Sequence, residues 1–307
     1  MRARIIIASA MILSILSCVK QPNEPVDNNT NTGKTGAFIL CEGTWGSDNS
    51  TLDRYDFQGN TIINDYYGIA NPGMKLGDLA SDIVVNGDKT YISVSTAHTI
   101  DVIETSTGKS LKQLILPANA YPRKICIVND STAFITDQRR NCVIQIRLTT
   151  MNVMKDSIPV GPAPEQIVNY NNRIFVANSG YGDLEANMPK AGTVSVLDMN
   201  SGQEVAELSS LPNVIELAIN KNAGKLYVCY YNLPSLKDSL GGIVEFDLNS
   251  LNELRRWKMD ATSITLSATG DTLFFFKDST ISLLKLNDAA PSSQTLIVNP
   301  NNNEYWY

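Results

Sequence analysis

Phe175-Val176-Ala177-Asn178 is one copy of a short unit that recurs along this chain. Each copy is an apolar run, usually closed by a small or polar residue, and a second strand-like segment follows it. The other copies are Tyr91-Ile92-Ser93-Val94, Phe134-Ile135-Thr136-Asp137, Tyr227-Val228-Cys229-Tyr230 and Leu273-Phe274-Phe275-Phe276. The segments that follow are Thr99–Glu104, Cys142–Arg147, Thr193–Asp198, Gly242–Asp247 and Thr280–Lys285. From Asp56 to Lys285 the ends of these second segments recur every 38–51 residues, which is typical of propeller blades.

The sequence therefore predicts an all-β fold, a β-propeller built from four-stranded antiparallel blades. The first strand of each blade is expected to line the central channel, and the fourth to lie at the outside. The predicted inner strands are Leu79–Val84, Arg123–Val128, Glu165–Asn169, Val214–Ile219 and Ser263–Leu266. The predicted outer strands are Leu111–Leu116, Met154–Pro159, Glu204–Leu208, Glu253–Met259 and Thr295–Val298. Turn-forming Asn, Gly and Asp residues separate the strands.

The two ends of the array are incomplete. Ala37–Glu42, Thr51–Asp56 and Asn60–Tyr66 predict a first blade that lacks its inner strand, and Asn301–Tyr307 begins a further inner strand. Glu304–Tyr307 could close a six-bladed ring. The interpretation that we favour is that the chain is a truncated piece, about six blades, of a seven-bladed ring. By itself such a piece would be an open ring with two exposed strand edges, which promote aggregation.

The N-terminal residues predict export and lipidation. Arg2 and Arg4 precede an apolar run, Ile5–Leu16. A helix of this length spans about 18 Å, which is too short to cross a hydrocarbon core roughly 30 Å thick, so the run is typical of a cleaved export signal. The ending Ile15-Leu16-Ser17-Cys18 resembles a bacterial lipobox, which implies that residues 1–17 are a lipoprotein signal peptide and that Cys18 carries the lipid. We expect 18–36 to be a flexible tether and 37–307 to be the propeller. An ordinary secretory signal is the alternative. The expected location is the outer membrane of the cell envelope, at the cell surface rather than in the periplasm.

Composition excludes several functions. The formal net charge is −6, and no basic run is present, which argues against nucleic acid as a partner. His98 is the single histidine, so a multi-histidine metal site is excluded, and it is expected in a surface turn. Asp183 and Glu185 are expected to be solvated charges. We therefore expect no metal, no cofactor and no catalytic residue.

Four cysteines remain after the lipidated one. Cys41, Cys126, Cys142 and Cys229 all fall inside predicted strands. Cys126 and Cys142 lie on the first and third strands of one blade, about 9.5 Å apart, beyond the disulfide limit of about 7 Å. We expect all four to act as small buried apolar residues, with a disulfide as the alternative.

Long connections between the second and third strands predict a binding face. They are residues 44–50, 179–192 and 232–241, and they share one face with the entrances to the inner strands. The candidate ligand-binding residues on that face are Trp45, Arg123, Asn178, Tyr181, Tyr230, Tyr231 and Trp306. Aromatic rings with an arginine on irregular loops can recognise a planar or extended ligand. The alternative is that several of these rings pack between blades.

The Phe175–Asn178 copy and its relatives resemble the Tyr-Val-Thr-Asn repeat of the YVTN family, propellers similar to quinoprotein amine dehydrogenase. Together with the N-terminal signal, the start Cys41-Glu42-Gly43-Thr44-Trp45-Gly46 resembles surface propeller lipoproteins of gut Gram-negative bacteria. Some members of that group capture cobalamin for an outer-membrane transporter. The resemblance thus implies capture of a small molecule, with a corrinoid as one option.

Our leading hypothesis is a lipid-anchored binding protein that is not an enzyme. Its partner would be a small molecule or an outer-membrane transporter, and it would contact the membrane only through the lipid. A propeller enzyme of the lactonase or quinoprotein dehydrogenase type is the alternative, with Asp82, Arg123, Glu165 and Glu216 as the polar residues of the inner strands. A scaffold protein of the envelope is a third possibility.

Overall fold

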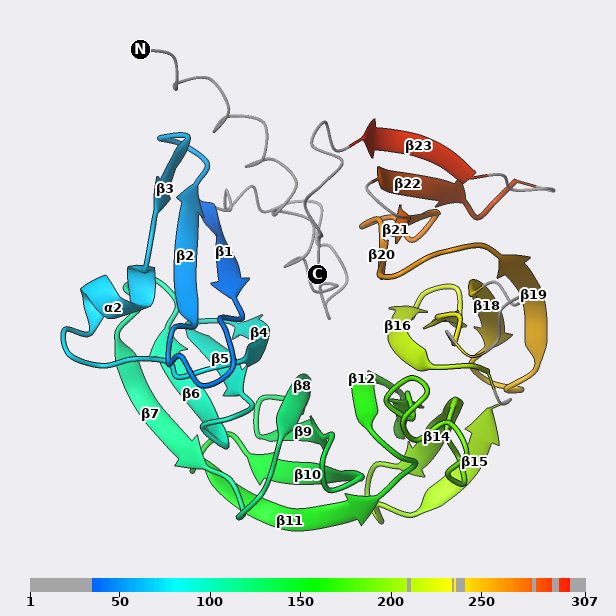
Figure 1. Cartoon of the computed structure of the whole chain (residues 1–307), viewed down its shortest axis with the longest axis horizontal. Coiled ribbons are helices and arrows are strands. Elements are labelled where there is room, and N and C mark those ends of the chain that lie inside the picture. Colours follow the sequence, from blue (N-terminus) through cyan, green and yellow to red (C-terminus); the bar gives the residue numbers. More distant parts are fainter. Residues whose placement is uncertain are drawn as a thin grey trace. The chain divides into compact units, whose positions relative to one another are not determined.

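The computed structural model describes residues 35–208, 211–233, 235, 241–277, 280–288 and 293–298. Within these residues the chain forms six antiparallel sheets, five of them four-stranded, so the predicted all-β propeller is confirmed (Figure 1). The predicted signal peptide, Cys18, Trp306 and the strand at 301–307 lie outside the described residues. The predicted tether is too long at its end, because Gly36 already begins a strand.

The strands of each sheet follow one another in chain order. The first sheet holds β1 (Gly36–Cys41), β2 (Thr51–Asp56) and β3 (Thr61–Ile63). The second holds β4 (Ala80–Asn86), β5 (Lys89–Val94), β6 (Thr99–Glu104) and β7 (Ser110–Ile115). The third holds β8 (Pro122–Asn129), β9 (Thr132–Asp137), β10 (Cys142–Arg147) and β11 (Asn152–Pro159).

The remaining three sheets repeat this plan. The fourth holds β12 (Pro164–Tyr170), β13 (Arg173–Asn178), β14 (Thr193–Asp198) and β15 (Glu204–Leu208). The fifth holds β16 (Val214–Asn220), β17 (Lys225–Tyr230), β18 (Gly242–Asp247) and β19 (Glu253–Lys258). The sixth holds β20 (Ile264–Leu266), β21 (Thr272–Lys277), β22 (Thr280–Lys285) and β23 (Ser293–Val298).

The predicted strand over 60–66 is wrong beyond Ile63. A five-residue helix, α2 (Tyr66–Ala70), follows the short β3. The Asp65 side chain accepts a hydrogen bond from the Gly68 backbone N–H at 3.1 Å, which caps the helix. Tyr66 and Tyr67 are buried in a cluster that also contains Leu52 and residues of the second sheet. Burial of both rings thus favours the helical turn over a longer strand.

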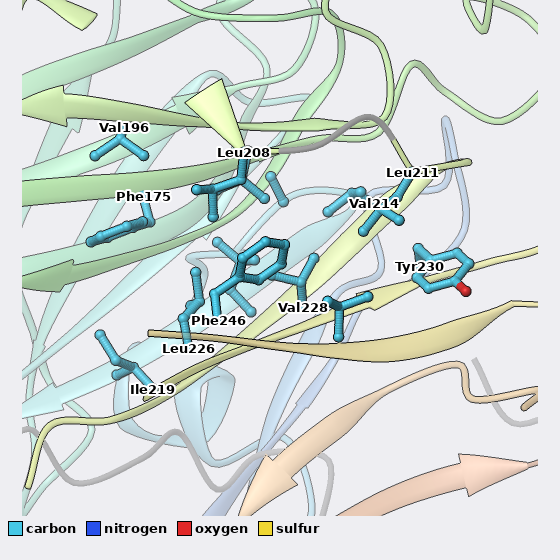
Figure 2. Close-up of a cluster of buried hydrophobic side chains, with 14 of the residues drawn as sticks. Phe175, Val196, Leu208, Leu211, Val214, Ile219, Leu226, Val228, Tyr230 and Phe246 are labelled. Carbon is cyan, nitrogen blue, oxygen red and sulfur yellow. The ribbon is translucent and has the colours of Figure 1, made fainter. Parts of the chain in front are cut away.

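The middle strands are apolar on both faces because neighbouring blades cover both. On β17, Leu226, Val228 and Tyr230 belong to one buried cluster, with residues of the fourth sheet (Figure 2). Tyr227 and Cys229, on the opposite face, belong to another cluster, with residues of the sixth sheet. Side chains alternate between faces along a strand, so each strand contributes to two cores.

By its contacts the chain divides into two compact units. The first unit contains the described residues up to Ile125, together with Arg147–Val153. The second unit contains Cys126–Ile146 and the described residues from Met154 on. The first unit holds the core around Tyr67 and Ile92. The second holds the clusters between its successive sheets. Each candidate site below lies within one unit.

The four cysteines are free. Cys126, Cys142 and Cys229 are buried, as predicted, and burial raises the pKa of the Cys142 and Cys229 thiols. Cys41, on β1, is only half-buried, so the prediction of burial is wrong for this residue.

Asp101, on β6, provides a test of the packing in the second sheet. Its carboxylate is 1% exposed and accepts hydrogen bonds from Thr99 Oγ1 at 2.8 Å and Gln113 Nε2 at 2.9 Å. Burial raises the pKa of this carboxyl, and the two hydrogen bonds oppose the rise. A raised pKa in the folded state means that stability falls as the pH rises above the unfolded value of about 3.9.

We expect the free energy of unfolding of Asp101→Asn, measured relative to that of the unchanged protein, to increase as the pH rises from about 4 to 7. The amide does not titrate, and it can still accept from Gln113 and donate to the Thr99 hydroxyl oxygen. Urea unfolding of both proteins at several pH values measures the difference. A difference that stays constant with pH would contradict the buried, titrating carboxylate.

Candidate functional site

Trp45 lies in the connection after β1 and is 63% exposed. We call residues 42–50 the Trp45 loop. The Asp78 side chain, which is 8% exposed, holds this loop from outside it. One carboxylate oxygen accepts from the Gly46 N–H at 2.5 Å, and the other accepts from the Asp48 N–H. An ionised acceptor for two backbone donors fixes the loop on either side of its turn.

A second set of hydrogen bonds fixes the end of the Trp45 loop to the entrance of β4. The Ser50 N–H donates to the Gly77 carbonyl at 2.8 Å, and Ser50 Oγ accepts from the Ala80 N–H at 3.1 Å. The same hydroxyl donates to the Glu42 carbonyl, at the start of the loop. The exposed indole is therefore carried by an ordered loop.

The Trp45 ring stacks on Tyr121, with ring centroids 6.3 Å apart and an interplanar angle of 25°. Tyr121 is 8% exposed and directly precedes β8. The next position but one, Arg123, forms an ion pair with Glu42, with an N–O distance of 3.6 Å. The structure thus brings together two predicted binding residues, Trp45 and Arg123, and adds Tyr121, which we had not predicted.

His98 supports the same region. It lies in the turn between β5 and β6, as predicted, with a left-handed φ of 57°. Its Nδ1 forms a hydrogen bond with the carbonyl of Ala120, the residue before Tyr121. The only histidine of the chain therefore fixes the segment that carries Tyr121, the ring on which Trp45 stacks.

Asn178 and Tyr230 are placed inside the fold. Asn178 is fully buried and donates to Thr193 Oγ1 at 3.0 Å and Ser195 Oγ at 2.9 Å. Tyr230 is 4% exposed and belongs to the core cluster of Figure 2. Both end their strands, as the repeat predicts, but their side chains serve packing and leave no surface for a ligand.

Tyr231 is half-buried and packs against the core next to β17. Burial raises the pKa of its hydroxyl, and the carboxylates of Glu216 and Glu165 raise it further. Glu165 is 7% exposed and accepts a hydrogen bond from Gln138 Nε2. Asp82, the other acid of the predicted catalytic alternative, accepts from the Ile125 N–H at 2.8 Å. These acids are largely engaged with the fold.

Tyr181 is 53% exposed and lies in the connection between β13 and β14. The neighbouring Asp183 is exposed, in line with the prediction of a solvated charge, and its carboxylate also accepts from the Ser235 N–H at 3.1 Å and from Ser235 Oγ. Glu185 is half-buried, which differs from the prediction. Among the described residues, no three His, Cys, Asp or Glu side chains group closely enough to hold a metal ion.

A polar groove of about 440 Å³ lies between the fourth and fifth sheets, next to the turn that joins β12 to β13. Its two charged side chains, Arg173 and Asp198, already form hydrogen bonds with groups in the turns that line the groove. Arg173 donates to the Leu248 carbonyl at 3.2 Å, and Asp198 accepts from Asn172 Nδ2 at 2.6 Å. Hydrogen bonds within the turn lower the pKa of Asp198, chiefly those from Ser201. The ordered, exposed aromatic loop around Trp45 is the stronger candidate site.

The fold and this site define a β-propeller that presents an ordered aromatic loop. The chain belongs to the family described as "Domain of unknown function (DUF5074)", which matches residues 35–306. None of the curated proteins matches the chain.

Solved structures with similar folds share little sequence with the chain. The WD40 domain of Neurospora crassa Pan2 is 11% identical, with a TM-score of 0.65 over 93% of this chain and 79% of that one. A Bacteroides fragilis protein provisionally described as a 6-phosphogluconolactonase is 11% identical, with a TM-score of 0.63 over 85% and 80%. Hydrazine synthase of Kuenenia stuttgartiensis is 13% identical, with a TM-score of 0.60 over 71% of this chain. The match spans 65% of that enzyme chain, and these likenesses show the fold alone.

In the part of the chain that the structure describes, no helix has the length and apolar character needed to cross a membrane.

Proposed function

We propose that this protein is a lipid-anchored binding protein of the cell envelope, without catalytic activity of its own, that captures a small molecule on the Trp45 loop. The observation that carries the proposal is that the indole is 63% exposed on a loop fixed by the buried Asp78. A large apolar ring held open to solvent in one geometry binds a ligand with little ordering cost.

The chemistry of the site favours a flat ligand with polar edges. The Trp45–Tyr121 stack offers an aromatic face, and Arg123 lies on the adjoining strand entrance, paired with Glu42. Arg123 can donate to amide or carboxylate oxygens of a ligand. A corrinoid combines a planar ring with amide groups, so it is the first candidate, with an outer-membrane transporter as the protein that would receive it.

The anchor and location rest on the sequence. The apolar run Ile5–Leu16 followed by Ser17-Cys18 supports lipidation at Cys18 and attachment to the outer membrane at the cell surface. The membrane would then be contacted through the lipid, and the propeller would remain free to bind its ligand.

We expect Trp45→Ala to weaken binding of cyanocobalamin about 30-fold, the loss typical when a tryptophan at the centre of an interface is truncated. Asp78→Ala should also weaken binding, because the Gly46 and Asp48 N–H groups lose the carboxylate that fixes the loop. Isothermal titration calorimetry of the full chain measures both. Phe57→Ala, at another exposed ring of the same unit (45% exposed), is the matched control and should bind normally.

Two results would contradict this proposal. Cyanocobalamin binding that survives Trp45→Ala would place the ligand elsewhere, and an unchanged protein that does not bind it would exclude the corrinoid. Hydrolysis of a lactone that is lost in Glu165→Gln and kept in Trp45→Ala would instead favour the lactonase alternative, two of whose acids, Glu165 and Glu216, raise the pKa of Tyr231.

A further inference from the structure

Residues 179–192, which we call the insert, join β13 to β14 and expose three large apolar side chains. Tyr181 is 53% exposed, Leu184 77% and Met188 43%. Two antiparallel strands need a loop of only about two to five residues, so the insert is longer than the fold requires. Single exposed apolar residues are common on protein surfaces, but three within eight residues of one connection are a candidate interaction site.

The insert is ordered by its own backbone. The Glu185 N–H donates to the Gly180 carbonyl at 2.9 Å, and the Met188 N–H donates to the Glu185 carbonyl at 2.9 Å. Gly192 closes the insert, and its N–H donates to the Asn178 carbonyl at 2.7 Å. A Cβ atom at Gly192 would lie 1.7 Å from the Leu211 carbonyl oxygen, so glycine is required there. The exposed side chains are thus held by a defined loop.

Tyr181 lies in a backbone conformation that is unfavourable for its residue type. Gly180, Tyr181 and Gly182 are three successive left-handed residues, with φ of 69°, 52° and 62°. Glycine adopts this region without steric cost, whereas a tyrosine there is strained. The ring is also more than half exposed, so it does not repay the strain by packing in the core. Such strain is characteristic of functional loops.

The exposure of the insert's apolar side chains favours a protein partner. A small ligand must be mostly enclosed, with about 70–90% of its surface buried. Tyr181, Leu184 and Met188 are instead 53%, 77% and 43% exposed, so they present apolar surface to solvent, as residues at a protein interface do before the partner binds. Tyrosine is enriched among the residues that dominate protein interfaces, and methionine adapts to irregular surfaces.

The charges around the insert narrow the partner further. Asp183, which is exposed, directly precedes Leu184, whereas Glu185 is half-buried, and the only base of the insert, Lys190, forms an ion pair with Glu204. The rim of the apolar group is therefore acidic. A second copy of this chain would meet the same acidic rim, and like charges across an interface are unfavourable. A partner with lysine or arginine around apolar residues is complementary.

We propose that the insert is a docking site for another protein, whose surface presents apolar residues bordered by lysine or arginine. Leu184 and Tyr181 pack against the apolar residues, and Asp183 lies against the basic border. The insert belongs to the second unit and the Trp45 loop to the first, and the proposal does not depend on capture of a small molecule at the Trp45 loop.

A displayed library of random peptides provides the probe. We expect selection on the full chain to enrich peptides with apolar residues flanked by lysine or arginine, whose binding weakens as salt is added. Leu184→Ser should reduce their affinity at least tenfold. Val205→Ser, at a residue of the same sheet that is 57% exposed on β15, should leave it unchanged, and so should Trp45→Ala.

Tyr181→Gly separates binding from folding. It should reduce peptide affinity at least tenfold while leaving the thermal unfolding midpoint unchanged or higher, because the left-handed backbone no longer carries a side chain. A lower midpoint would mean that the ring is structural, which would overturn the proposal. So would an unproductive selection, selected peptides without basic residues, binding that survives Leu184→Ser, or a dimer in sedimentation that Leu184→Ser dissociates.

Discussion

Phe246→Ala is expected to lower the free energy of unfolding by about 3–5 kcal/mol, the range found for truncation of a buried phenylalanine. Phe246 lies on β18 and is 2% exposed. Its ring is part of the cluster that joins the fourth and fifth sheets, with Phe175 and Val228 among its members (Figure 2). Removing the ring loses its transfer free energy and leaves a cavity, because strands fixed on both faces cannot close around it.

Urea unfolding of the full chain measures the effect. Phe246→Leu keeps much of the volume and should lose less, about 1–2 kcal/mol. Val205→Ala, on the exposed face of β15, should stay within about 0.5 kcal/mol. If Phe246→Ala and Val205→Ala had similar small effects, the two sheets would not be joined by a packed core at this point.

Most of the strands could be predicted because their signals are local. The five predicted second segments coincide with β6, β10, β14, β18 and β22. The apolar runs and the turn residues between them determine these boundaries without reference to the rest of the chain. Helix α2 could not be predicted in this way, since Tyr66 and Tyr67 are typical strand residues and become helical by burial against Leu52.

The candidate site was only partly predictable, for a different reason. Trp45, Arg123 and Tyr181 lie on loops or at a strand entrance, where irregular sequence indicates exposure. Asn178 and Tyr230 close strands whose two faces are both buried, so a polar or aromatic residue there says little about solvent.

Asp78 was missed for a further reason. It supports the Trp45 loop through contacts 30 and 32 positions away in the sequence, and no short motif reports such pairs. Tyr121 was missed in the same way, since its stacking partner Trp45 is distant along the chain.

Arg255→Ala should lower the free energy of unfolding by about 3 kcal/mol, because it leaves a buried carboxylate without its cation. Glu245, on β18, is 4% exposed and accepts hydrogen bonds from Arg255 Nε at 2.9 Å and from a second guanidinium nitrogen. The guanidinium also donates to the Leu286 carbonyl at 3.0 Å and lies 4.9 Å from the centre of the Trp257 ring. One side chain thus joins β18, β19 and the segment after β22.

The adjacent residue provides the matched control. Arg256 pairs with Glu253 at 2.7 Å, but both side chains are about a third exposed, so Arg256→Ala should cost at most about 1 kcal/mol. Adding Glu245→Gln to Arg255→Ala should recover part of the loss, since the amide carries no charge to be left unpaired. Equal losses from Arg255→Ala and Arg256→Ala, with no recovery in the double variant, would show that solvent reaches Glu245 and that its burial does not set the energy of the pair.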